Sequence, residues 1–218
     1  MEIGKIINLI KKECNNKNFQ IPIVTEVSDL HNDPFKVLIS CVLSLRTKDA
    51  VTAKASNNLF KVANTPEKIL KLEVKEIEKL IYPVGFYKTK AKNLKEICKF
   101  LIEKHNSKVP DSEEELLKLK GVGRKTMGIV MCYGFHKNSH IPVDSHVHEV
   151  ANRLGWVKTK TPEQTEQELM KIIPKKYWHD LNDLFVKYGQ NICVPVSPYC
   201  SKCVVNKYCN KIGIKYSR

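Results

Sequence analysis

No apolar stretch of the 218-residue sequence is long enough to cross a membrane, which requires about 20 consecutive apolar residues. The first residues, MEIGKIINLIKKEC, also lack the apolar segment and cleavage site of a secretory signal peptide. We therefore expect a cytoplasmic, intracellular protein with no membrane partner. No oligomerisation helix stands out, so we also expect a monomer.

Strand-like alternation of apolar and polar residues is nearly absent, and so are internal repeats and low-complexity linkers. Apolar residues instead recur at helical spacing, which predicts an all-α fold. The segment 21–27, IPIVTEV, could form a short strand, but it has no partner strand and is interpreted as a connector.

Three helix starts are marked by a capping residue followed by proline, namely Asp33-Pro34, Thr65-Pro66 and Thr161-Pro162. The first opens an apolar helix, FKVLISCVLSL, which we place at the centre of the core. Further helices are predicted at 1–15, 49–63, 74–82, 89–105, 112–118, 124–136, 144–154 and 177–188.

Acidic residues are scarce relative to basic ones. The chain has 23 Asp and Glu against 37 Lys and Arg, giving a net charge of +14. Such an excess favours a polyanionic partner. Solvated helix faces in a lysine-rich protein would produce the same charge, so charge alone leaves both interpretations open.

The segment 116–130, LLKLKGVGRKTMGIV, predicts two helices joined by a tight turn at Gly121, Val122 and Gly123. Glycines let backbone N–H groups converge on one anion, and the next helix adds the positive end of its dipole. The turn and the following Arg124 therefore form a candidate phosphate-binding site.

Lys125 stands just inside the second helix of this hairpin. The helix N-terminus and Arg124 disfavour a second positive charge, which should make Lys125 easier to deprotonate. A lysine in this setting can act as a Schiff-base nucleophile. A plain helix corner with a solvated lysine would have the same local sequence.

Asp144 precedes another predicted helix. A carboxylate here could stabilise a positively charged transition state or help to deprotonate an amine, but an Asp before a helix is most often an N-cap. His146 and His148 are two residues apart and do not share a helix face, which argues against a two-histidine metal site.

The last quarter of the chain contains Cys193, Cys200, Cys203 and Cys209 in the pattern C-x6-C-x2-C-x5-C. Structural disulfides are uncommon inside cells, whereas four closely spaced thiolates can surround a metal centre. Zinc sites usually have two Cys-x-x-Cys pairs, so the single pair here favours a [4Fe–4S] cluster. The other cysteines, Cys14, Cys41, Cys98 and Cys132, fall in predicted helices and are interpreted as small core residues.

Three motifs occur in a fixed order: LKGVGRKT at 119–126, PVDSHVHEVANRL at 142–154, and the four-cysteine tail. With LISCVLSLRTKD at 38–49, GFYKTKAKNL at 85–94 and KYGQNIC at 187–193, they cover nearly the whole chain. The sequence resembles the endonuclease III family of DNA glycosylase/AP lyases, the iron–sulfur subclass of the helix-hairpin-helix superfamily.

The resemblance implies two helical lobes. A six-helix barrel with the helix-hairpin-helix would occupy 28–137, and an iron–sulfur cluster lobe would combine 1–27 with 138–218. The partner implied is double-stranded DNA with damaged bases or abasic sites, which would associate the protein with the nucleoid. The target nucleotide would be flipped out of the duplex.

By position, Lys125 matches the family's nucleophile and Asp144 its catalytic aspartate. Lys125 would attack C1′ of the damaged nucleotide, expel an oxidised or ring-saturated pyrimidine and form a Schiff base, and β-elimination would then cut the strand on the 3′ side. Gly121, Val122, Gly123 and Arg124 match the DNA-binding hairpin, and the four tail cysteines match the cluster ligands.

Several positions depart from the family pattern. Arg46 replaces a common Gln that fills the gap left by the flipped nucleotide, and Phe86 replaces a leucine wedge, although a core phenylalanine is an equal alternative. Glu149 replaces a frequent Arg. The loop VPVSPY at 194–199 has no basic residue, so Lys202, Lys207 and Lys211 would have to supply any positive charge there.

Two further functions remain open on the sequence. One is a glycosylase of the same fold for mismatched or alkylated bases, because pocket residues are hard to read. The other is a non-catalytic DNA-binding module, against which Lys125 and Asp144 together argue.

Overall fold

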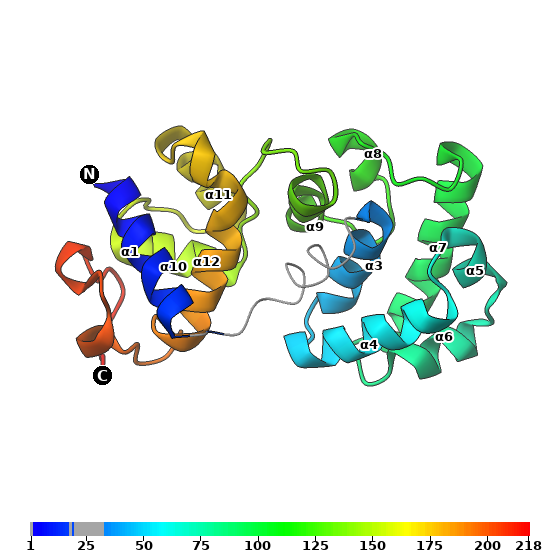
Figure 1. Cartoon of the computed structure of the whole chain (residues 1–218), viewed down its shortest axis with the longest axis horizontal. Helices are drawn as coiled ribbons and strands as arrows, with labels where there is room; N and C mark the ends of the chain where they lie inside the picture. The colour runs from blue at the N-terminus through cyan, green and yellow to red at the C-terminus, as the bar shows by residue number, and fades with distance from the viewer. Residues whose placement is uncertain (1, 18, 20–32) are drawn as a thin grey trace. The chain divides into compact units, whose positions relative to one another are not determined.

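The computed structural model describes residues 2–17, 19 and 33–218. These residues form helices, turns and loops with no strand among them, so the predicted all-α fold is confirmed (Figure 1). No helix in this part of the chain is both long and apolar enough to span a membrane. The predicted connector at 21–27 and the predicted boundary between 27 and 28 lie outside the described residues.

The described residues fall into two compact units. Unit 1 combines the N-terminal residues with Asn138–Arg218, and unit 2 is the segment 33–137. Each unit has its own hydrophobic core, so each can be understood by itself.

Unit 2 is built around α3 (Pro34–Ser44), in which every residue from Val37 to Leu43 is buried. This confirms the predicted central helix. Helices α4, α7 and α9 pack against α3. The remaining elements of the unit are α4 (Asp49–Val62), α5 (Pro66–Lys71), α6 (Val74–Ile81), α7 (Tyr87–His105), α8 (Glu113–Leu117) and α9 (Arg124–Ile129).

Unit 1 contains α1 (Ile3–Asn16), α10 (Ser145–Leu154), α11 (Pro162–Ile172) and α12 (Trp178–Asn191). Helix α12 packs against both α1 and α10, and its Phe185 and Tyr188 are buried between them and the rest of the core. After α12 the chain continues as loops with two short 3-10 turns, Cys200–Lys202 and Asn206–Tyr208.

The three predicted cap-proline starts are confirmed. The Asp33 carboxylate accepts from the Phe35 N–H at 2.9 Å, and the hydroxyls of Thr65 and Thr161 each accept from an N–H three residues later at 3.3 Å. These bonds satisfy amides that have no partner within the helix.

Three predicted helix bounds are wrong. The helix predicted at 177–188 extends to Asn191 as α12. Helix α7 begins at Tyr87 rather than at 89, directly after Phe86 in the left-handed region. The helix predicted at 124–136 is α-helical only to Ile129 and then continues as a π-helix, Val130–Gly134. Its end packs closely on α3, since a Cβ at Gly134 would lie 3.1 Å from the Pro34 Cα.

Cys14, Cys41, Cys98 and Cys132 are buried, which confirms their interpretation as core residues. Burial raises the pKa of Cys41 and of Cys98 to about 12. These thiols therefore remain protonated and behave as small apolar side chains.

Candidate functional site

The turn between α8 and α9 is shaped by its glycines. Gly121 has a positive φ of 76°, and a Cβ there would lie 3.1 Å from the Asn93 Nδ2, so this position favours glycine. The Val122 side chain is buried and anchors the turn, while its N–H donates to the Leu119 carbonyl at 3.1 Å. Gly123 is the N-cap of α9 and, having no side chain, offers no cap to the amides of the first turn.

Lys125 is the second residue of α9, and its side chain is exposed, as is that of Arg124. The positive charge of Lys125 acts on Cys41, opposing the rise that burial causes in the pKa of that thiol. Lys125 is therefore exposed at the start of α9, a helix that packs against α3, directly after the turn of Gly121 and Gly123. The structure thus brings the predicted nucleophile and the predicted phosphate-binding turn together.

Asp144 belongs to unit 1 and is the N-cap of α10. Its carboxylate accepts from the Val147 N–H at 3.0 Å, so the capping role considered from the sequence is confirmed. The backbone just before Asp144 is held in place as well, because buried Asn182 donates to the Pro142 carbonyl at 2.8 Å. This half-buried carboxylate is held at the positive end of a helix.

His146 and His148 occupy different surroundings on α10. The His146 ring lies against α12, where a Cβ at Gly189 would come within 2.8 Å of its Nδ1. The His148 Nδ1 lies 2.6 Å from the Thr165 hydroxyl oxygen. Both histidines therefore act in packing and hydrogen bonding within unit 1.

Arg46 and Phe86 lie on two loops of unit 2 and contact each other. The Phe86 side chain is 60% exposed, so the alternative of a core phenylalanine is wrong. The Arg46 guanidinium carbon lies 5.0 Å from the centroid of the Phe86 ring. Sequence reasoning did not identify the residue behind these loops, Lys90, whose buried ammonium bonds to the loop of Arg46.

The four tail cysteines line one cavity in unit 1, together with Ile192, Tyr199 and Ile214. Three of their sulfurs are hydrogen-bond acceptors. The Tyr188 hydroxyl donates to Cys203 at 3.2 Å, the Arg153 guanidinium to Cys193 at 3.4 Å and the Lys211 N–H to Cys209 at 3.4 Å. In the described part of the chain, no three or more His, Cys, Asp or Glu side chains are grouped to hold a metal ion.

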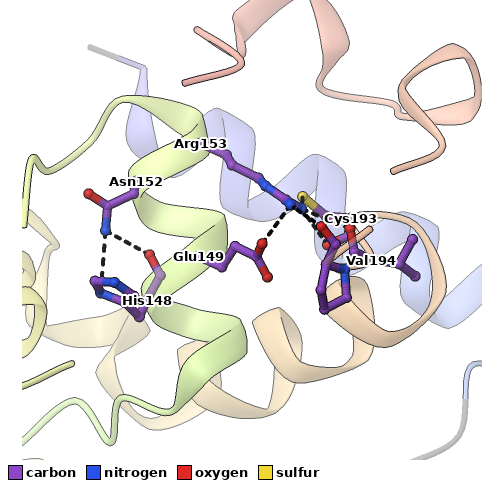
Figure 2. Close-up of polar contacts among 7 residues, drawn as sticks. His148, Glu149, Asn152, Arg153, Cys193 and Val194 are labelled. Atoms are coloured by element: carbon purple, nitrogen blue, oxygen red, sulfur yellow. Dashed lines mark hydrogen bonds and ion pairs between the residues drawn. The ribbon is translucent and has the colours of Figure 1, made fainter. Parts of the chain in front are cut away.

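Arg153 connects α10 to the first cysteine of the tail, as Figure 2 shows. This buried guanidinium donates to the carbonyls of Cys193 and Val194 at 2.9 Å each and to that of Pro195 at 2.7 Å. Glu149, one turn earlier on α10, lies 2.5 Å from Arg153 and balances its charge. Glu149 thus serves an internal ion pair, and neither it nor Arg153 was assigned this role from the sequence.

The loop at 194–199 obtains positive charge from a residue that the sequence did not suggest. The Arg218 guanidinium stacks 4.0 Å from the centroid of the Tyr199 ring, and Lys202 lies 5.4 Å from the same centroid. Lys202 is one of the three lysines expected to supply charge here. Arg218 also donates to the Ser197 carbonyl at 2.9 Å.

Comparisons with known proteins agree on one family. Residues 39–175 match the model of the HhH-GPD superfamily of base excision DNA repair proteins. Endonuclease III of Thermotoga maritima is 49% identical over 177 residues, which are 81% of this chain and 83% of that protein. Endonuclease III of Haemophilus influenzae is 34% identical over 203 residues, covering 89% and 96% respectively.

Solved structures extend the likeness to three dimensions. The structure of a trapped endonuclease III–DNA covalent intermediate, an estranged-adenine complex, matches with a TM-score of 0.84 and 33% identity over 96% of this chain and 95% of that one. A thermostable thymine-DNA glycosylase matches with a TM-score of 0.82 and 27% identity over 94% of each chain. The chain therefore belongs to the endonuclease III family of base excision repair DNA glycosylase/AP lyases, within the HhH-GPD superfamily.

Proposed function

We propose that this DNA glycosylase/AP lyase removes oxidised or ring-saturated pyrimidines from duplex DNA, with Lys125 as the nucleophile and Asp144 as the carboxylate that assists it. The observation that carries the proposal is the position of Lys125. It is an exposed amine in the first turn of α9, directly after the open glycine turn. The trapped covalent complex of a related endonuclease III supports covalent chemistry in this family.

The amine of Lys125 would act in both steps, excision of the base and cleavage of the strand. The neutral Lys125 Nζ attacks C1′, and the glycosidic C1′–N bond breaks as the base leaves with the electron pair and takes up a proton. Opening of the sugar ring then gives an iminium ion between Nζ and C1′. The iminium acidifies the C2′ proton, so removing this proton breaks the C3′–O bond and releases the 3′ strand as a 5′-phosphate.

Asp144 would stabilise the positive charge that develops on the sugar and assist Lys125. Its hydrogen bond to the Val147 N–H fixes the carboxylate on α10, so the cap and the catalytic role are compatible. A carboxylate held in advance does not have to reorganise during the reaction.

DNA would be bound by the hairpin and by two inserting side chains. The backbone of Gly121, Val122 and Gly123, with Arg124, would hold one phosphate, which the net charge of +14 supports. Arg46 would occupy the gap left by the flipped nucleotide, and Phe86 would act as the wedge between bases. Their exposure and mutual contact support both roles.

We further propose that Cys193, Cys200, Cys203 and Cys209 bind a [4Fe–4S] cluster. The cysteines share one cavity, and donors already point at three sulfurs, as is common around thiolate ligands. The choice of an iron–sulfur cluster over zinc rests on the single Cys-x-x-Cys pair of the tail, because zinc sites usually have two such pairs. When bound, the cluster would tie the tail to the end of α12.

The hairpin and the cluster would belong to different lobes. The lobe with the hairpin would be 28–137, the cluster lobe would combine 1–27 with 138–218, and the protein would act as a monomer on duplex DNA. Such a substrate would place the protein with the cell's DNA.

A second candidate is the removal of a mismatched base, which the match to a thymine-DNA glycosylase of the same fold favours. The experiment that separates the two is a single-turnover assay on duplexes with thymine glycol, a G·T mismatch or an alkylated base. We expect excision of thymine glycol with strand cleavage. Excision of mismatched thymine alone would replace the proposed substrate class.

A further inference from the structure

Lys90 of α7 is a buried lysine, only 6% exposed, whose ammonium is engaged by the end of α3 and the loop that follows it. It donates to the carbonyls of Leu43 at 2.8 Å and Leu45 at 2.5 Å, and to the Thr47 hydroxyl at 3.2 Å. Each of the three N–H groups of the Lys90 ammonium thus has an oxygen acceptor. Burial lowers the pKa of Lys90 to about 8.

The same loop is fastened to the segment that precedes α7. The Gly85 N–H donates to the Thr47 hydroxyl at 3.1 Å, so one hydroxyl joins Gly85 to Lys90. A Cβ at Gly85 would lie 2.6 Å from the Arg46 carbonyl oxygen, and a larger residue would therefore force the two loops apart.

These contacts surround the two side chains proposed to enter DNA. Arg46 and Phe86 both have left-handed backbones, with φ of 54° and 58°. This conformation costs a non-glycine residue about 1–2 kcal/mol, so it persists only where neighbouring contacts impose it. Arg46 lies between Leu45 and Thr47, which both bond to Lys90, and Phe86 follows Gly85.

We infer that Lys90 is a positioning residue that holds the loops of Arg46 and Phe86 together, so that the two side chains meet DNA as one preassembled wedge. The inference rests on the proposed wedge role of these residues. Its physical basis is preorganisation, because a wedge already in place loses less entropy on insertion. Lys90 itself is buried, so its role would be to position the two loops and not to touch DNA.

The test uses Lys90→Met, which keeps the apolar stem and removes the three hydrogen bonds. Lys95→Met is the matched control, because Lys95 is also on α7 and donates to a backbone carbonyl, that of Leu72 at 2.6 Å, on a different connection. Both changes replace a lysine of α7 by methionine, and measuring at saturating protein removes the effect of any difference in overall DNA affinity. Thr47→Val is a second variant that leaves Lys90 in place.

The readout is the fluorescence of 2-aminopurine placed opposite a stable abasic-site analogue, with the duplex saturated by protein. Insertion of the wedge displaces the orphaned base and raises the fluorescence. We expect a clear rise with the natural protein and with Lys95→Met. The rise should fall about tenfold with Lys90→Met, given what hydrogen bonds to a charged group contribute, and should fall less with Thr47→Val.

Borohydride trapping on a single-stranded abasic oligonucleotide separates this inference from the proposed function. Single strands need no wedge, so Lys90→Met should be trapped as efficiently as the natural protein. An unchanged fluorescence rise in folded Lys90→Met and Thr47→Val, or equal losses in the Lys90 and Lys95 variants, would overturn the inference. If Lys90→Met does not fold, the result with Thr47→Val decides. A natural protein that gives no trapped adduct on either single-stranded or duplex abasic DNA would count against the proposed chemistry instead.

Discussion

The guanidinium of Arg46 lies over the ring of Phe86, 5.0 Å from its centroid, and joins two loops that are 40 residues apart in the sequence. Both residues have positive φ angles, and both side chains are exposed. An exposed pair on strained backbone is more readily explained by binding than by folding, because strain of this kind concentrates at functional sites.

Phe86→Gly should raise the stability of the protein while lowering its excision activity. Glycine relieves the left-handed strain, so we expect the free energy of unfolding to rise by up to about 1 kcal/mol. Loss of the aromatic wedge should lower single-turnover excision about tenfold, which corresponds to one stacked base. Urea unfolding and a glycosylase assay would check both changes. Phe86→Ala, which retains the strain, should lose activity without the gain in stability.

The buried Lys90 predicts a specific pH dependence of stability. Its pKa is lowered to about 8 in the folded protein from 10.5, so between these values the unfolded chain binds more protons. The free energy of unfolding should therefore contain a contribution that rises from pH 8 to pH 10.5 and is constant below pH 8. Comparing denaturant unfolding of the natural protein and of Lys90→Met at pH 7.5 and pH 10 would reveal it. If the free energy of unfolding changed equally between pH 7.5 and pH 10 in both proteins, the lowered pKa could not be assigned to Lys90.

Asp144 can be tested in two ways because its cap and its charge are separable. Asp144→Asn keeps an acceptor for the Val147 N–H, so stability should change by less than about 0.5 kcal/mol, whereas Asp144→Ala should cost about 1 kcal/mol. Excision by Asp144→Asn should still fall by about 10²–10³, as expected when a charge aligned with the transition state is removed. Normal excision by Asp144→Asn would restrict Asp144 to a structural role.

The contacts of Arg153 predict how firmly the cysteine tail would retain the proposed cluster. Arg153→Met would remove the donors to Cys193, Val194 and Pro195 and leave Glu149 without its partner. We expect iron to be lost to a chelator about tenfold faster, as when contacts around metal ligands are deleted. Visible absorbance and iron content over time would measure this loss. Retention at the natural rate would show that Arg153 does not support the cluster.

Local signals in the sequence predict much of the fold. The Thr65-Pro66 and Thr161-Pro162 starts are confirmed because a cap is satisfied within three residues. The π-helix Val130–Gly134 could not be predicted, because the end of that segment depends on packing against Pro34, far away in the sequence.

The sequence identified candidate site residues only where a local motif, such as a turn or a helix cap, marks them. Lys125 and Asp144 stand beside recognisable turns and caps. Lys90 lies in the polar segment KTKAKNLK and resembles a surface lysine, because its acceptors are mostly carbonyls more than 40 residues away. Arg218 was missed for the same reason, since its contact with Tyr199 depends on where the tail folds back.

The most direct test of the central claim is borohydride trapping of the cluster-loaded protein on a duplex with one abasic site. The natural protein should give a covalent adduct, and so should Lys120→Ala, which removes another exposed lysine of the same turn. Lys125→Ala should give none, and Lys125→Arg should not restore it, because a guanidinium stays protonated. An adduct formed by folded Lys125→Ala in natural yield would contradict the assignment of Lys125 as the nucleophile.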